Sequence, residues 1–513
     1  MRSLWLAGFL IAVPLLAGDV GQVSFANSGS PEAQEPFLRG LALLHNFEYA
    51  SAAEAFRDAQ QRDPSFAMAY WGEAMTHTHP IWFQQDSAAA RTVLQRHGAT
   101  AGERLAKAGS ERERDYLRTL DVLYGEGSKQ QRDFQYADAM AALHARYPDD
   151  VDATAFYALA LLGTAHAGRD FAIYMRAAAL LEEVFPANRR HPGVLHYLIH
   201  SYDDPLHAPL GMRAAKIYGS VAPNAGHALH MTSHIFIAMG MWDEVIDANR
   251  RAIDVVNRER EAKGKPRAEC GHYPTWLHYG YLQQARADDA RRALDACRAS
   301  AFTETFRAGS AMDTKRSRVE GYLAMRAYHI AGGGSLTAAD AVAIPEGEEY
   351  AEARFTFAYG DALAAGSRGD ADALKSAVAH MRAQTKSVLA SIAKQETAAN
   401  PAARIAVEVM LQEAEALELI AMGRRAEALP LLESAASAER SMPLEFGPPV
   451  IPKPAAELLA EQLAAAGRAA DAAAAYELVL ARTPGRTVAV EGLRRLQTAA
   501  AKREEKPASV HVH

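Results

Sequence analysis

Hydrophobic residues recur every three or four positions along most of this chain, which is the spacing of one buried face of an α-helix. The helical segments are short, come in pairs and are separated by turns that contain glycine or end at proline. Residues 37–64 show the pattern clearly, because Gly40 stands where the first helix of a pair needs a small residue and Pro64 ends the second. The inward positions of that second helix are Tyr49, Ala52, Phe56 and Ala59. No segment alternates strictly between apolar and polar residues, as a half-buried strand would, so the chain is predicted to be all-α.

The same periodicity predicts helices through the rest of the chain, with two interruptions. Residues 331–347 contain three consecutive glycines, and residues 445–454 (EFGPPVIPKP) form a rigid proline-rich connection. The predicted helices or helix pairs cover residues 66–77, 101–108, 111–124, 132–146, 151–165, 171–185, 192–223, 226–257, 270–297, 312–330, 348–365, 370–395, 401–422, 423–435, 455–484 and 488–496.

These paired segments resemble the tetratricopeptide repeat (TPR), in which two helices recur about every 34 residues. The resemblance implies a superhelical solenoid of antiparallel helix pairs. It divides the chain into an N-terminal array over 27–330, a linker over 331–347 and a C-terminal array with a capping helix over 348–500. Residues 501–513 are predicted to be a disordered tail.

Two motifs are similar to those of a histidine-rich group of exported bacterial TPR proteins. HYLIH at 196–200 matches an HYxIH segment, and HALHMTSH at 227–234 matches an HxxHMxSH segment one repeat later. The segments HNFEY and AMAYWGEAM match as well. A TPR fold implies partner binding but does not identify a chemical reaction.

Histidine is concentrated in residues 191–240, which hold seven of the 19 histidines of the chain. Two HxxxH segments occur there, His196 with His200 and His230 with His234. Residues four apart share one face of a helix. Since the two segments are one repeat apart, equivalent positions should lie side by side. Four imidazoles are therefore predicted to face the same space.

The TPR resemblance further implies that particular positions of each first helix line a concave surface. The register follows from Gly240, which matches the glycine between the two helices of a repeat. The residues that then fall on concave positions are His227, His230, His234, His196, His200, Asp203, His45 and His272.

Neutral imidazole is a common protein ligand for zinc, copper and iron, so this group of residues predicts a metal centre. A mononuclear centre would use His196, His200, His230 and His234. A binuclear centre would add His227 and one further residue from among His45, His207 and His272. Copper or zinc suits an all-nitrogen set of ligands, and iron is an alternative.

Three further residues are predicted to assist these ligands. Asp203 and Asp204 are carboxylates that could orient the imidazoles. His227 is either a fifth ligand or a catalytic proton carrier. The competing interpretation is that the histidines form a polar groove that holds no metal.

The net charge and the N-terminal sequence indicate where the protein is located and which partners it could bind. The chain has 513 residues and a net charge of −7, and it lacks the basic excess of a nucleic-acid-binding protein. Arg2 and the apolar run 4–16 predict a signal peptide over 1–26, cut after Ala26 or, alternatively, after Gly18. No later run is long enough to span a membrane, so a periplasmic or secreted protein without stable membrane insertion is expected. The alternative is that the apolar run stays in place as an uncleaved membrane anchor. The only cysteines, Cys270 and Cys297, form either one disulfide or two buried thiols.

Two functions fit these observations. The first is an exported metalloprotein that acts as a metal-dependent oxidoreductase or hydrolase on a small-molecule substrate. The alternative is an interaction scaffold that binds a peptide or an envelope protein in its concave groove. The sequence contains no phosphate-binding loop, no GxSxG nucleophile motif, no HExxH motif and no CxxCH haem attachment site.

Overall fold

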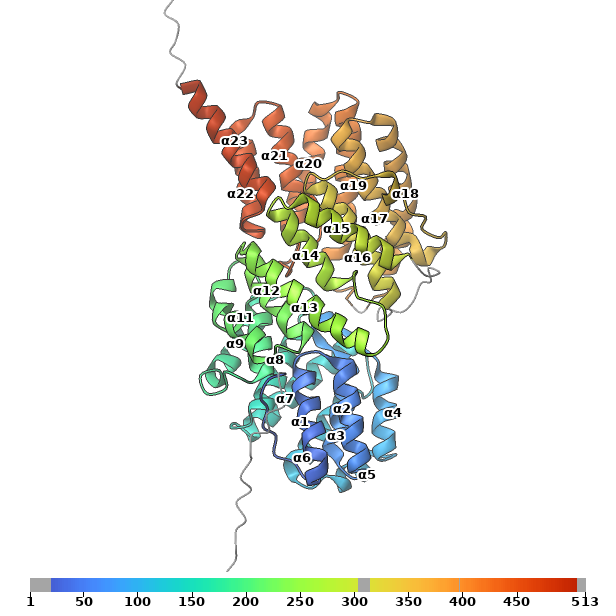
Figure 1. Ribbon diagram of the computed structural model, residues 1–513, viewed down its shortest axis with the longest axis vertical. Helices are drawn as coiled ribbons and strands as arrows, with labels where there is room; N and C mark the ends of the chain where they lie inside the picture. The colour runs from blue at the N-terminus through green and yellow to red at the C-terminus, as the bar shows by residue number, and fades with distance from the viewer. Residues whose placement is uncertain (1–19, 303–313, 396, 505–513) are drawn as a thin grey trace, which may run out of the picture. The chain divides into compact units, whose positions relative to one another are not determined.

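The computed structural model describes residues 20–302, 314–395 and 397–504, whose regular secondary structure is almost entirely α-helix (Figure 1). The predicted all-α fold is therefore confirmed. The described residues form two compact units. The first contains residues up to 165 together with 171–201 and 216–229, and the second contains 166–170, 202–215 and the chain from 230 onward. The predicted signal peptide falls largely on residues 1–19, which lie outside the described residues.

The first unit contains nine complete helices and one short strand pair among its described residues. Its elements are α1 (Pro31–His45), α2 (Tyr49–Arg62), α3 (Ala67–Met75), β1 (Thr78–His79), η1 (Pro80–Trp82), β2 (Gln84–Gln85), α4 (Ser87–His97), α5 (Ala101–Lys107), α6 (Glu111–Leu123), α7 (Lys129–Arg146), α8 (Val151–Leu162) and α9 (Phe171–Val184). Helices α10 (Pro192–Tyr202), α11 (Ala208–Val221) and α12 (Gly226–Ala238) contribute residues to both units.

The second unit continues as helix pairs to the end of the described chain. Its elements are α13 (Trp242–Ala262), α14 (His272–Gln283), α15 (Ala287–Ala301), α16 (Thr314–Ala331), η2 (Ala338–Asp340), η3 (Glu348–Tyr350), α17 (Ala351–Arg368), α18 (Ala371–Ile392), α19 (Ala402–Ala421), α20 (Arg425–Ser441), α21 (Ala455–Ala465), α22 (Ala469–Arg482) and α23 (Thr487–Glu504). None of the described helices is long and apolar enough to cross a membrane.

The turns inside the helix pairs repeat one backbone conformation. In six pairs, a residue with a left-handed backbone precedes the second helix by two positions. These residues and their φ angles are Phe47 (58°), Gly240 (67°), Ala285 (53°), Gly369 (67°), Gly423 (79°) and Gly467 (78°). The recurrence confirms the TPR-type helix pairs and the choice of Gly240 as a register mark.

Small residues let the helices of the first pairs approach closely. A Cβ atom added to Gly40 would lie 2.9 Å from the ring of Phe56, and one added to Gly72 would lie 2.3 Å from it. The Phe56 ring is fully buried between these two glycines. The packing predicted for the pair over 37–64 is therefore present.

The described residues also contain one short strand pair that the sequence did not indicate. Thr78 pairs with Gln85 and His79 with Gln84 in antiparallel register. The connecting turn depends on Phe83, whose φ is 54°. Strands of two residues are too short to give an alternating pattern, so the sequence could not indicate them.

Residues 331–347, predicted to be a linker, lie within the second unit. Asp340 connects this segment to α15, because its buried carboxylate accepts hydrogen bonds of 2.9 Å from both terminal nitrogens of Arg291. The division between the compact units falls instead among residues 166–229. Helix α23 reaches Glu504, past the predicted start of the disordered tail, and residues 505–513 lie outside the described residues.

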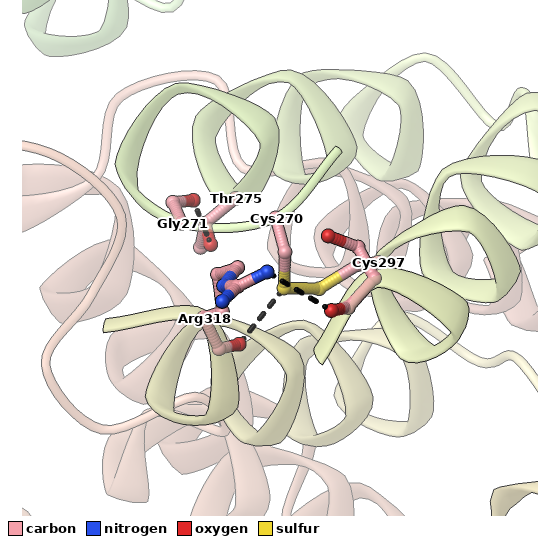
Figure 2. The surroundings of a disulfide bond; sticks show 6 residues. Cys270, Gly271, Thr275, Cys297 and Arg318 are labelled. Atoms are coloured by element: carbon pink, nitrogen blue, oxygen red, sulfur yellow. Dashed lines mark hydrogen bonds between the residues drawn. A yellow bond between two sulfur atoms is a disulfide. The ribbon is translucent and has the colours of Figure 1, made fainter. Parts of the chain in front are cut away.

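The two cysteines form a disulfide in the second unit. Cys270 lies just before α14 and Cys297 lies near the end of α15, and both are buried (Figure 2). The bond therefore closes the α14–α15 helix pair at one end. Of the two states that the sequence left open, the structure has the disulfide.

Residues 20–26 are part of the packed core of the first unit. Phe25 lies 5.2 Å from the ring of Tyr116 and 5.5 Å from that of Phe37, and the Arg112 guanidinium lies 4.1 Å above it. The carbonyl of Val20 accepts a hydrogen bond of 2.7 Å from Asn46. Cleavage after Ala26 would remove these contacts, whereas cleavage after Gly18 would keep them.

If a signal peptide is removed, we therefore expect the new N-terminus to precede Val20, which intact-mass measurement would detect. Replacing Phe25 by alanine should lower the free energy of unfolding of the first unit by about 3 kcal/mol, because a buried aromatic ring is lost. Urea denaturation of the variant would measure this loss. An N-terminus at Asn27, or a loss below about 1 kcal/mol, would contradict the expectation.

A buried carboxyl group in the second unit should make its stability pH-dependent. Burial raises the pKa of Glu413 well above its ordinary value, and Tyr359 donates a hydrogen bond of 2.7 Å to Glu413 Oε2. A raised pKa means that the folded state holds this proton to higher pH than the unfolded state does. The contribution to stability is thus full below the unfolded pKa and is lost as pH rises through the folded pKa.

Replacing Glu413 by glutamine should remove this pH dependence, because the amide still accepts from Tyr359 but does not titrate. The stability of the variant relative to the unmodified protein should then rise steadily from pH 5 to pH 8 in urea denaturation. Glu408→Gln, at an exposed position on the same helix, is the matched control and should show no such trend. Parallel pH profiles for Glu413→Gln and the unmodified protein would disprove the expectation.

Candidate metal centre

The histidines predicted from the sequence lie on a few helices and form compact groups within each unit. His196, His200 and His227 come together in the first unit and are called cluster 1 here. His230, His234 and His272 come together in the second unit and are called cluster 2. In each cluster, every residue offers a ring nitrogen, and these nitrogens lie within 4.8 Å of one another. Such a spacing is close to that of ligands around one metal ion.

Cluster 1 is enclosed by the first unit. Its three imidazoles are between 0% and 6% exposed, and their Nε2 atoms are buried. His196 Nδ1 donates a hydrogen bond of 2.6 Å to the carbonyl oxygen of His45, at the C-terminal end of α1. In a neutral ring this leaves the lone pair on Nε2. The backbone N–H of His227 donates to Glu48 Oε1 at 2.9 Å, which satisfies an N–H in the first turn of α12.

Phe47 places its ring among the three imidazoles of cluster 1. Its ring centroid lies 4.2 Å from that of His196, 5.6 Å from His227 and 6.0 Å from His200. Phe47 also occupies the left-handed position of the helix-pair turn, where four of the other five repeats have glycine. A bulky residue with positive φ costs of order 1–3 kcal/mol and tends to mark a functional site. The strained backbone at Phe47 thus coincides with the histidine cluster.

Cluster 2 contains two imidazoles whose protons are directed away from each other. His230 Nδ1 lies 2.7 Å from Asn249 Oδ1, and the amide nitrogen of Asn249 donates to the carbonyl of Val245. His230 therefore donates from Nδ1. His234 Nδ1 likewise donates to Asp203 Oδ2 at 2.9 Å. The two Nε2 atoms, which carry lone pairs in the neutral rings, are 3.2 Å apart.

Aromatic residues hold the rings of cluster 2 in place. His234 stacks on Trp276 and on Phe446, with centroid distances of 4.6 and 4.8 Å. Phe446 belongs to the proline-rich connection, and a Cβ added to the next residue, Gly447, would lie 2.4 Å from the Trp276 ring. His272 lies 4.5 Å from His230, centroid to centroid, and is the exposed member of the cluster. Cluster 2 thus has two buried rings and one that solvent reaches.

The predicted carboxylates contact different partners. Asp203 is buried and binds both His234 and Arg169. Asp204 binds Arg169 at 3.4 Å and accepts from His207 Nδ1 at 2.9 Å. His207 therefore interacts with a carboxylate and does not belong to either cluster.

His45 forms a separate hydrogen-bonded group with Asp152 and His191 in the first unit. Asp152 Oδ1 accepts from His45 Nε2 at 2.9 Å and from His191 Nε2 at 3.3 Å. Tyr197 donates to His45 Nδ1 at 3.0 Å. Burial lowers the pKa of His45 to about 4, although the hydrogen bond to Asp152 opposes the shift. Both ring nitrogens of this neutral imidazole have hydrogen-bond partners. The ligand atoms of His45, Asp152 and His191 also lie within 4.8 Å of one another, so the role of His45 as a metal ligand stays a prediction.

The sequence identified the histidines of both clusters but missed the residues that orient them. Asn249, Trp276, Phe446 and Phe47 were not predicted as site residues. The motif HNFEY contained a signal, because its phenylalanine stands where other repeats have glycine. The predicted centre of His196 and His200 with His230 and His234 takes ligands from both units, and it remains a prediction.

No protein-family model and no curated protein matches this chain. Among solved structures it is similar to yeast Tom70, with 11% identity, 93% of this chain and 91% of that chain covered, and a TM-score of 0.33. It is similar to the human IFIT1 dimer with m7Gppp-AAAA, with 11% identity, 93% and 92% coverage and a TM-score of 0.36. The TPR domain of P58(IPK) gives 12% identity, 92% and 99% coverage and a TM-score of 0.22. At these values the likeness carries no information about function.

Proposed function

We propose that this chain is an exported metal-binding protein with two histidine centres, one formed by cluster 1 and one by cluster 2. The observation that carries the proposal is the pair of Nε2 atoms of His230 and His234, 3.2 Å apart, with both Nδ1 atoms donating elsewhere. Two lone pairs at this distance repel each other unless a cation lies between them. That cation is either a proton, which makes one ring an imidazolium, or a metal ion.

The distance suits a metal ion. Metal–nitrogen bonds of about 2.0–2.1 Å at a tetrahedral angle put two ligand nitrogens about 3.3 Å apart. Asn249 and Asp203 fix the ring orientations, as outer hydrogen-bond acceptors do for metal-bound imidazoles. A third nitrogen from His272 completes a three-histidine set.

The imidazole ligands limit which metal ions would bind and which reactions the centre would support. Imidazole-only sites favour zinc or copper, with iron as a further candidate. Three protein ligands leave one coordination position for water or substrate, which is the arrangement of catalytic zinc sites. Because His272 is exposed, cluster 2 is the centre that a small-molecule substrate would reach, either for hydrolysis or for a redox reaction. Cluster 1 is enclosed and is better suited to a structural role.

Elemental analysis of protein purified from the periplasm without a histidine tag tests the proposal. We expect two equivalents of zinc or copper per chain, or recovery of two equivalents after removal of metal and reconstitution. No bound metal after reconstitution would overturn it.

A second candidate function, a peptide-binding scaffold, is favoured by one observation. A cavity of about 290 Å³ lies between the proline-rich connection and α22, and its lining residues Val450 and Leu478 are 44% and 42% exposed. An apolar peptide side chain would fit there. Metal-free protein that still captures a peptide partner would support this alternative.

A further inference from the structure

Helix α10, which carries His196 and His200 of cluster 1, packs against the side chain of His45. Gly193 lies in the first turn of α10, and a Cβ atom added there would lie 2.3 Å from His45 Nδ1. Tyr197, one helical turn later, donates a hydrogen bond of 3.0 Å to the same nitrogen. The His45 ring is therefore a contact point that fixes where α10 lies in the first unit.

The backbone of His45 contacts cluster 1 as well. Its carbonyl oxygen belongs to the last residue of α1 and accepts the hydrogen bond of 2.6 Å from His196 Nδ1. Carbonyl groups in the last turn of a helix have no partner within that helix, so they are available to side chains. An acceptor at Nδ1 holds the imidazole ring in place, as outer acceptors do for metal-bound histidines. His45 thus holds α10 through its side chain and a cluster 1 imidazole through its main chain.

Asp152, the second residue of α8, in turn holds the His45 ring. Its Oδ1 atom lies 2.9 Å from His45 Nε2 and 3.3 Å from His191 Nε2, and all three side chains are buried. The backbone N–H of Val194 donates to His191 Nδ1 at 3.3 Å, so the neutral His191 ring carries its proton on Nε2. His191 therefore gives Asp152 a hydrogen bond and does not offer a lone pair there. This geometry fits a hydrogen-bond network better than a third metal site.

We propose that Asp152, acting through His45, is a positioning residue for cluster 1 and raises the metal affinity of this centre without binding the metal itself. This inference rests on the proposed function. His196 is the ligand most directly affected, because its Nδ1 acceptor and the place of its helix both depend on His45. His227 belongs to α12, and its backbone N–H is held by Glu48. Loss of Asp152 should therefore displace the α10 ligands relative to the α12 ligand.

Zinc titration against a chromophoric chelator tests the inference, in a His234→Ala background so that cluster 1 is measured alone. Asp152→Leu leaves two buried imidazole N–H groups without their acceptor, and it should weaken zinc binding about 10- to 100-fold, the range seen when residues that orient metal ligands are lost. Cobalt should bind with unchanged stoichiometry but an altered ligand-field spectrum, because the three imidazoles remain and their arrangement changes. Gly193→Ala, which pushes α10 away from His45 without removing a buried charge, should lower zinc affinity as well. Cluster 2, measured in a His200→Ala background, should keep its affinity in both variants.

Asp150→Leu is the matched control for a general loss of stability. Asp150 lies two residues before Asp152 and accepts hydrogen bonds from Arg112 and Tyr116, so this variant should lose stability but keep zinc affinity. Equal losses of affinity in both leucine variants, or unchanged affinity in Asp152→Leu or in Gly193→Ala, would overturn the inference while leaving the metal centre in place.

The zinc stoichiometry distinguishes the remaining outcomes. A further equivalent of zinc that Asp152→Leu removes would overturn the inference, because His45, Asp152 and His191 would then be metal ligands themselves. Absence of zinc binding at cluster 1 in the His234→Ala parent would overturn the inference and the proposed centre together.

Discussion

Replacing His200 by alanine should remove one of two bound metal equivalents, and replacing His234 by alanine should remove the other. His200 belongs to cluster 1 and His234 to cluster 2, and each cluster draws its nitrogens from one compact unit. The double variant should therefore retain no metal. Metal content after reconstitution, measured by elemental analysis, gives the stoichiometry directly.

The expected loss of metal affinity follows from the number of ligands in each centre. A structural zinc site with four ligands contributes about 10–16 kcal/mol of binding free energy, so one ligand contributes roughly 3 kcal/mol. Since about 1.4 kcal/mol corresponds to a tenfold change, loss of one imidazole should weaken binding by at least about a hundredfold. Metal-induced stabilisation should fall in the same variants, because ligand binding to the folded state raises its stability.

His207→Ala is the matched control for His234→Ala. His207 lies in the same unit and contacts Asp204, but it belongs to neither cluster, so two equivalents should remain. The mononuclear centre predicted from the sequence gives a different result: one equivalent in the parent protein, and none in either His200→Ala or His234→Ala. The two arrangements are therefore distinguished by counting metal.

The repeat architecture could be predicted because it depends on local spacing. Gly40 and Phe56 occupy the positions that the pattern of residues 37–64 requires, and Gly240 has the left-handed backbone expected of a repeat turn. Ala285 has the same left-handed backbone at the corresponding turn, although it is an alanine. The sequence did not indicate the strand pair of Thr78–His79 with Gln84–Gln85, because strands of two residues are too short to show an alternating pattern.

The candidate site could be predicted only in part, for a physical reason. A 34-residue offset shows which helices carry imidazoles, but the approach of ring nitrogens depends on side-chain torsions and on residues distant in the chain. Asn249 orients His230 from α13, and Phe446 stacks on His234 from a segment more than 200 residues later. Neither residue is of a type that signals metal binding, so no motif could include them.

Removing one member of the buried ion pair between Glu457 and Arg486 should lower the stability of the second unit by about 3–5 kcal/mol. Arg486 is 1% exposed, and it binds Glu457 Oε1 at 2.9 Å and the Tyr279 hydroxyl at 2.9 Å. Lys453 lies 3.1 Å from the same carboxylate. Burial alone would raise the pKa of Glu457, but the two cations hold it at about 2. This network joins α14, α21 and the start of α23, so it connects the last repeat to the helix that carries His272.

The cost arises because the remaining charge stays buried without its partner. Arg486→Met should therefore destabilise strongly, and Arg486→Met/Glu457→Leu should destabilise less than the sum of the single changes, because no unpaired carboxylate remains. Hydrogen exchange of peptides covering 272–283 and 455–482 would measure the loss of stability in the second unit. Arg468→Met, which breaks the exposed pair with Asp471, is the control and should change stability by less than about 1 kcal/mol. If Arg486→Met cost no more than this control, the network could not be what fixes the C-terminal repeats to α14.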